Sequence, residues 1–324
     1  MGSVLIMAGD FIFTGCSFTW GQGLWSYCTT KHKVPTVTEY IDGAGVPDAA
    51  IRFLERNRWP HIVAKAFKAR EIIKRNNGGT DDESLRFINQ VKENHVSKET
   101  LLTQNVEWDT VKLCVFQTTQ LYRSSFYFNY KGEDYRVFSE PSKRNFDRIE
   151  KVQITDENGI ELQYPIILEE TKNFDVFINW LIDNNYSIEE FEKILIDTMC
   201  NRIKNKLKEL EEKYNIQTLI VCWTDEYVEK ILSDDWLSKR LVKIQHDKAL
   251  PSDKNTIVTT EYNCIDDAMQ YSPELIISKD NKNRLHPSGD DEHPSLECHK
   301  IIAESVVNKI NENRKFLFYG NELS

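Results

Sequence analysis

Residues 10–21 of the chain read DFIFTGCSFTWG. The apolar, β-prone start of this run predicts a buried strand over residues 10–16, and Gly15 and Gly21 bracket a tight turn at its end. In an open α/β sheet, ligands bind beyond the carboxyl ends of the strands, beside the N–H groups that begin the following helices. Ser17 is therefore expected to lie exposed at the ligand-binding edge of such a sheet.

A second polar cluster lies near the other end of the chain, in the run Asp290-Asp291-Glu292-His293-Pro294-Ser295. A serine hydroxyl is a weak nucleophile until a histidine accepts its proton, and the histidine needs a third group to orient it. Asp290 and His293 supply both partners within one turn of chain. The sequence therefore favours a catalytic triad with Ser17 as nucleophile, His293 as base and Asp290 as the orienting group.

Simpler interpretations of the same residues stay open. Ser17 also fits a turn or a helix N-cap, and Asp290 and His293 fit a solvated acidic loop. A metal site formed by His286, His293 and His299 is a third alternative, but the chain has no second ligand-rich cluster, so we predict no metal. Cys16, beside Ser17, is expected to pack rather than to react.

In order, spacing and location, these three residues resemble the triad of the SGNH (GDSL-like) hydrolase superfamily. In that family the serine follows strand one, and the aspartate and histidine stand shortly before the last helix. The run Asn76-Asn77-Gly78-Gly79-Thr80-Asp81 resembles the family's glycine-containing block after strand two. The resemblance implies an oxyanion hole made by the N–H groups of Ser17 and Gly79, with Gly78 as the second choice for the glycine.

The chain departs from the family pattern at two places. The first block reads Gly-Cys-Ser-Phe where the family has Gly-Asp-Ser-Leu, and no asparagine follows the third predicted strand. Thr119 stands where the family's third block carries its asparagine, and Gln117 offers an amide from nearby. The third oxyanion donor is therefore left open between Thr119 and Gln117.

Segments that alternate between strand and helix suggest a parallel sheet covered by helices on both faces. The resemblance implies a three-layer α/β/α sandwich with a mostly parallel, flavodoxin-like sheet of about five strands. The predicted strands are 10–16, 71–73, 111–116, 217–223 and one near 275–277; the predicted helices are 59–70, one capped by Asp81 or Asp82, 173–184, 187–213 and 295–313.

The alternation breaks in the middle of the chain. The α/β domain is assigned residues 1–121 and 214–324, and residues 122–213 are assigned to an inserted lobe, β-rich over 122–170 and helical over 171–213. Because the lobe enters after strand three, we expect it near the active-site face, where its aromatic rings shape the site, mediate self-association into a homo-oligomer, or pack a small core of their own. Trp20 and Arg123 are expected to contact substrate, and Trp20 equally fits core packing.

The composition and charge of the chain limit the classes of partner and the cellular locations that we expect. The net charge of -10 and the absence of a large basic patch argue against nucleic acid. No run of about 18 apolar residues predicts a membrane span, and residues 1–8 lack the basic residues of a signal peptide. Seven cysteines, an odd number without a CxxC pair, favour a reducing compartment. We expect a cytoplasmic protein, or a virion component if the chain is phage-encoded.

The function expected from these features is ester hydrolysis through an acyl-serine intermediate, without a cofactor. The substrate class is a small-molecule or carbohydrate ester, such as an O-acetyl group on a sugar. A non-catalytic binding or structural module of the same fold, for example in a phage virion, is the alternative. The intact triad favours the enzyme, and the missing third-block asparagine favours the alternative.

Overall fold

The structure is a computed structural model that describes residues 9–21, 24, 27, 48–73, 79–94, 105–121, 126–137, 151–155, 161–165, 174–250, 253–276 and 293–319. Its centre is a four-stranded sheet in the order β2-β1-β3-β8, and every neighbouring pair is parallel. The strands span Asp10–Thr14 (β1), Arg70–Ile73 (β2), Val111–Gln117 (β3) and Gln217–Val221 (β8). The mixed α/β class with a parallel sheet is therefore confirmed.

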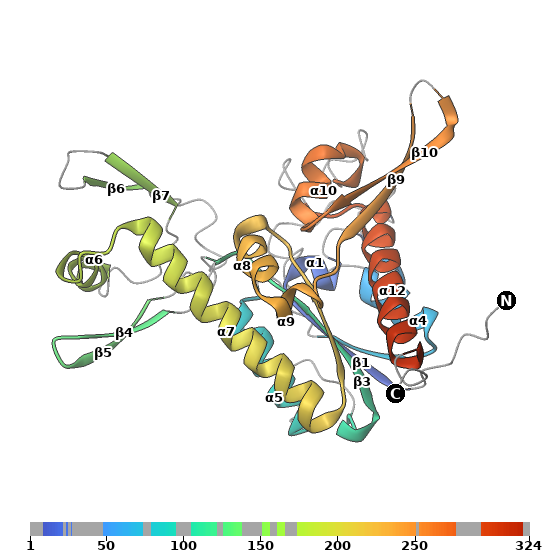
Figure 1. The fold of residues 1–324 in the computed structure, drawn as a ribbon, viewed down its shortest axis with the longest axis horizontal. Helices are drawn as coiled ribbons and strands as arrows, with labels where there is room; N and C mark the ends of the chain where they lie inside the picture. The colour runs from blue at the N-terminus through green and yellow to red at the C-terminus, as the bar shows by residue number, and fades with distance from the viewer. Residues whose placement is uncertain are drawn as a thin grey trace.

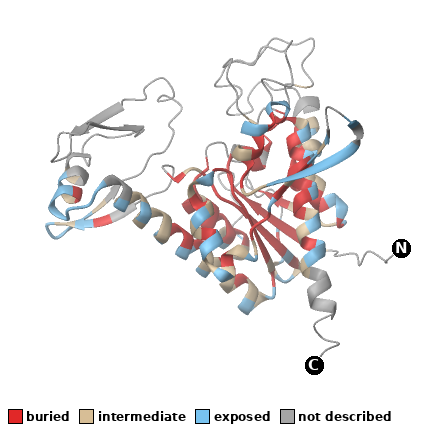
Figure 2. Cartoon of the chain, turned by 45° about the horizontal axis from the view of Figure 1, so that its top comes forward, coloured by how far each residue is buried: buried red, intermediate tan, exposed pale blue. Residues whose placement is uncertain are grey.

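Most residues of β1, β3 and β8 are buried and apolar because helices cover both faces of the sheet. Phe11 and Phe13 of β1 belong to one apolar cluster, whereas Ile12 belongs to another, as the alternation of side chains along a strand requires. Figures 1 and 2 show helices on both sides of the buried strands. The first cluster includes residues of α4 (Trp59–Ala66), α10 (Ile265–Tyr271) and α12 (Leu296–Tyr319); the second includes residues of α5 (Asp81–Lys92), α7 (Ile188–Tyr214), α8 (Val228–Ser233) and α9 (Asp235–Ser238).

Beyond β8, a short segment around Leu241 lies against the edge of the sheet. The Ile220 N–H donates to the carbonyl of Arg240 at 2.8 Å, and the Val242 N–H donates to the carbonyl of Ile220 at 2.8 Å. These bonds form an isolated parallel bridge between Ile220 and Leu241. A second isolated parallel bridge joins Cys222 to Cys264, so within the described residues the sheet has four strands and two single bridges beside β8, and a five-stranded sheet is not confirmed.

The strand predicted near 275–277 is wrong for Leu275. Residues Pro273–Leu275 form a 3-10 helix, because a proline at its start fixes a helical φ and has no N–H for a sheet. Ile276 then pairs with Pro294 in an isolated antiparallel bridge. Ile277 lies outside the described residues.

A two-stranded antiparallel ribbon, β9 (Ile244–Leu250) and β10 (Asp253–Tyr262), projects from the body (Figure 1). No pattern in the sequence predicted this ribbon. Ile257 and Val258 are both exposed although neighbouring strand residues face opposite sides, so neither face of the ribbon is covered there. The apolar periodicity that identifies strands is consequently weak in this stretch.

The inserted segment contains two hairpins and a helix. They are β4 (Phe126–Tyr130) with β5 (Glu133–Val137), β6 (Lys151–Thr155) with β7 (Glu161–Pro165), and α6 (Phe174–Asp183). Phe128 and Leu181 are the buried centre of a small cluster that Tyr130, Tyr135 and Trp180 also join. At least three of the lobe's aromatic rings therefore pack a core of the lobe itself.

Helix α7 connects this lobe to the sheet (Figure 1). It begins with a reciprocal capping box between Ser187 and Glu190 and ends at Asn215 in the left-handed conformation. Its first turns carry Phe191 into the lobe cluster. Its later turns pack in the apolar cluster of the sheet through Met199, Cys200, Ile203, Leu207 and Leu210. The second part of α7 is therefore part of the α/β core.

We predict that Leu207→Ala lowers the free energy of unfolding by about 3 kcal/mol, because Leu207 is fully buried and the truncation leaves a cavity. The matched control is Ile182→Ala in α6, whose side chain is 62% exposed and should change stability by less than about 0.5 kcal/mol. Urea unfolding monitored by circular dichroism measures both. Equal effects of the two substitutions would contradict the assignment of α7 to the core.

Candidate active site

The carboxyl ends of three neighbouring strands meet at one edge of the sheet. Thr14 at the end of β1 pairs with Phe116, and Gln117 at the end of β3 pairs with Val221. Because β2 and β3 flank β1 on opposite sides, the connections after β1 and β3 diverge there, and such a switch point is where open α/β sheets bind ligands. Ser17 begins the short helix α1 (Ser17–Trp20) directly after β1 and therefore lies at this edge.

The turn between β1 and α1 depends on Gly15. Its φ is +146°, and a Cβ added there would lie 2.2 Å from Thr19 Oγ1 and 2.9 Å from Gln117 Cβ. The Thr19 N–H donates to the carbonyl of Cys16 at 3.1 Å, which closes the turn around Ser17. Only a residue without a side chain permits this approach between the turn and β3.

Gln117 is fully buried at the end of β3, and its amide contacts the turn at two points. Oε1 accepts a hydrogen bond from Thr19 Oγ1 at 2.8 Å, and Nε2 donates to Cys16 Sγ at 3.3 Å. Thr19 Oγ1 also lies 3.2 Å from the carbonyl of Thr14. The amide that the sequence offered as an oxyanion donor thus holds the turn that carries Ser17. Cys16 is buried with its thiol against this amide, as expected for a packing role.

Thr119, the other candidate for the third donor, uses its backbone N–H elsewhere. That N–H donates to Asp81 Oδ1 at 2.9 Å, and the Tyr227 hydroxyl donates to Asp81 Oδ2 at 2.9 Å. The Thr119 side chain is fully buried. The Thr119 N–H is therefore engaged by Asp81, and the Gln117 amide is held against the turn by both its oxygen and its nitrogen.

Asp81 is a buried acid that the sequence analysis did not assign to the site. Burial raises its pKa from the ordinary 3.8 to about 7, against the opposing hydrogen bonds from Thr119 and Tyr227. The predicted cap of this helix is also corrected: Thr80 is the N-cap and accepts from the Glu83 N–H at 3.1 Å, while Asp81 starts the helix. Gly79 is buried directly before this cap, in the connection after β2.

His293 lies beside the Ser17 turn although the two are far apart in sequence. Its ring centroid is 5.1 Å from that of Phe18, the residue after Ser17, and Phe18 in turn lies 4.1 Å from Trp223 at the end of β8. The Ser295 N–H donates to the carbonyl of Leu275 at 2.7 Å and fixes the chain after His293. The structure thus brings His293 to the edge where β1 and β8 end.

Other predicted site residues fall outside the described part of the molecule. These are Asp290, Gly78, Arg123 and His286, together with the side chains of Ser17 and Trp20. Within the described ranges, no three His, Cys, Asp or Glu side chains are grouped so as to hold a metal ion. Among the helices described, none has the length and apolar content needed to cross a membrane.

His299 occupies the interior of α12, as expected for a structural histidine. Its Nδ1 accepts from the Trp59 N–H at 3.3 Å, which ties α12 to the start of α4. Burial is the main cause that lowers its pKa to about 3, and electrostatic interactions with His293 and Arg58 act in the same direction. A histidine that stays neutral in this way cannot serve as the proton carrier of a triad near neutral pH.

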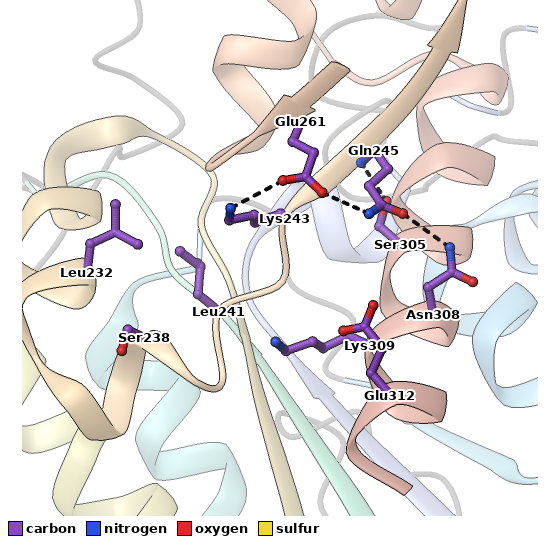
Figure 3. Close-up of a pocket in the computed structure, with 10 residues that line it drawn as sticks. All are labelled: Leu232, Ser238, Leu241, Lys243, Gln245, Glu261, Ser305, Asn308, Lys309 and Glu312. Atoms are coloured by element: carbon purple, nitrogen blue, oxygen red, sulfur yellow. Dashed lines mark hydrogen bonds and ion pairs between the residues drawn. The ribbon is translucent and has the colours of Figure 1, made fainter. Parts of the chain in front are cut away.

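A small surface pocket of about 120 Å³ lies away from these strand ends, between the β9–β10 ribbon and α12 (Figure 3). Its polar side chains are largely paired with one another: Lys243 and Gln245 contact Glu261 at 3.2 Å and 3.0 Å, and Asn308 donates to Gln245. The pocket contains none of the predicted site residues. It therefore offers no chemistry for the proposed triad.

Comparisons with protein-family models, with curated proteins and with solved structures found no match. The residues and their geometry therefore carry the functional assignment.

We predict that Asp81 stabilises the fold by an amount that falls as pH rises from about 4 to 8, so the difference in the free energy of unfolding between the wild type and Asp81→Asn should fall over this range. The wild-type value falls less steeply, because His299, whose pKa burial lowers to about 3, contributes stability that rises with pH over the acidic part of the range. A carboxyl whose folded pKa is raised contributes stability below its unfolded pKa and loses it as pH passes through the folded pKa. The separation between 3.8 and about 7 corresponds to about 4 kcal/mol.

Urea unfolding at several pH values measures this dependence. Asparagine keeps an acceptor for the Thr119 N–H, and the exposed Asp235→Asn is the control that should leave the pH profile unchanged. An unchanged profile in Asp81→Asn would show that Asp81 is not the titrating group.

Proposed function

We propose that this chain is a serine hydrolase of the SGNH type, with the three-layer α/β/α sandwich of that family, and that it cleaves an ester through an acyl-serine intermediate. One observation carries the proposal: His293 packs against Phe18, next to Ser17, at the carboxyl end of the central strand β1. A serine at this edge with a histidine beside it has the arrangement that nucleophilic acyl transfer requires.

The reaction proceeds in two halves. Ser17 Oγ attacks the ester carbonyl while His293 accepts the hydroxyl proton, and His293 then passes this proton to the leaving alcohol as the carbon–oxygen bond breaks. In the second half, water attacks the acyl-serine, His293 accepts the water proton and returns it to Ser17 Oγ, and the acid is released. Asp290 holds the imidazole in the required tautomer.

The developing oxyanion is held by the N–H groups of Ser17 and Gly79. A donor of this kind typically contributes about 3 kcal/mol to the transition state. The Thr119 N–H donates to Asp81 and the Gln117 amide contacts the turn, so the proposal assigns neither of them as a third donor. A carbohydrate O-acetyl group or another small ester fits this machinery, and the loops around the site select among them.

The alternative is a binding or structural module that keeps the fold without catalysis. The engagement of Gln117 and Thr119 favours it, because a family enzyme would present a third donor there. A fluorophosphonate probe distinguishes the two functions, since it phosphonylates a serine only where a base activates it. Labelling at Ser17 supports the hydrolase, and a wild-type protein that stays unlabelled supports the binding module.

We predict that Ser17→Ala and His293→Ala each lower kcat for a short-chain ester by about 10³-fold or more, because the two residues act as a unit. Asp290→Asn should also lower kcat, since the aspartate orients the imidazole.

The matched controls are Ser233→Ala and His61→Ala, which alter a serine and a histidine outside the proposed site and should keep wild-type turnover. Hydrolysis of p-nitrophenyl acetate and mass-spectrometric mapping of the phosphonylated peptide are the measurements. Turnover or labelling that survives Ser17→Ala would exclude Ser17 as the nucleophile.

A further inference from the structure

Gln117 places a buried polar amide at the end of an otherwise apolar stretch of β3. Residues 113–116 are fully buried Leu, Cys, Val and Phe, and Gln117 continues the strand with 0% exposure. Burying an amide without hydrogen bonds costs about 2 kcal/mol or more, so its two bonds are needed to offset the cost. Both bonds go to the β1–α1 turn rather than to another part of β3.

The two contacts of the amide bracket Ser17 in the sequence. Nε2 donates to the side chain of Cys16, immediately before Ser17, and Oε1 accepts from the side chain of Thr19, two residues after it. The absence of a side chain at Gly15 allows Gln117 and Thr19 to approach. One side chain of β3 thus fixes the turn on both sides of the proposed nucleophile.

We propose that Gln117 is a positioning residue: it holds the Gly15–Thr19 turn so that Ser17, with its own N–H, is aimed at the ester carbonyl. This inference rests on the proposed function. A reacting group misplaced by about 1 Å can lose about 10²-fold in rate, so a turn fixed from both sides has a direct kinetic consequence. Gln117 does not touch the substrate in this scheme and acts through Cys16 and Thr19.

The test uses substitutions on both sides of the contact. Thr19→Val keeps the shape of Thr19 and removes its hydrogen bond, Thr19→Ser keeps the hydroxyl, and Gln117→Met keeps the length of Gln117 without its polar atoms. Thr14→Val is the matched control, because Thr14 is equally buried, lies in the same segment, and has a hydroxyl without a hydrogen-bond partner among the described residues.

We expect Thr19→Val and Gln117→Met each to slow fluorophosphonate labelling of Ser17 and to lower kcat by about tenfold or more, with KM changed by less than about twofold. Thr19→Ser should restore the rate to within about twofold, and Thr14→Val should not change it. The double variant should be no slower than the slower single variant, since both remove the same interaction.

Amide hydrogen exchange over residues 16–19 provides a second readout that needs no activity. Exchange should be faster in Thr19→Val than in Thr14→Val. If Gln117→Met does not fold, Thr19→Val alone is sufficient to test the contact. Wild-type labelling rates in folded Thr19→Val and Gln117→Met, or unchanged exchange, would overturn the positioning role and leave the hydrolase intact. A wild type that is not labelled refutes the hydrolase, and with it any catalytic consequence of the turn.

Discussion

The close contact between the β1–α1 turn and the end of β3 is the constraint on which the proposed site depends. It requires a glycine with φ of +146° at position 15, because any side chain there would collide with Thr19 and Gln117. It also requires that β1 and β3 be neighbours that end together, as their parallel register provides. With β2 on the other side of β1, the turn stands at the switch point of the sheet, where the following chain segments separate.

His293 reaches the same edge through contacts made on one face of the sheet. Helix α12 packs on α4, and His299 accepts a hydrogen bond from the Trp59 N–H between them. Ahead of this helix, Pro294 bridges to Ile276 and Ser295 bonds to Leu275, so the segment carrying His293 has little freedom. The His293 ring then lies against the Phe18 ring. Phe18 also packs against Trp223, which follows the end of β8. The apolar core therefore sets the position of the polar groups above it.

Sequence patterns predicted the elements whose burial is regular. Strands β1, β3 and β8 and helices α6 and α7 fall close to their predicted ranges, because the apolar residues of each recur with one regular period. The last helix begins where predicted but continues to Tyr319, six residues past its predicted end. The β9–β10 ribbon was not predicted because it is largely exposed and shows little apolar alternation. The segment at Leu241 was not predicted because a single bridging residue cannot produce an apolar period. The role of Asp81 was equally hidden, since its partners Thr119 and Tyr227 lie 38 and 146 residues away. An acid directly after a Gly-Thr cap is the only local signal, and any solvated helix start gives the same one.

The distribution of buried polar groups argues that this edge of the sheet has a purpose besides stability. Gln117, Thr118 and Thr119 are all fully buried in succession after an apolar strand, and Asp81 is buried beside them. An interior chosen for stability alone would continue with apolar side chains, since each buried polar group must find partners to offset its desolvation. Rules of this kind are broken most often at functional sites, and the strand end that breaks them here is the one whose Gln117 holds the turn that carries Ser17.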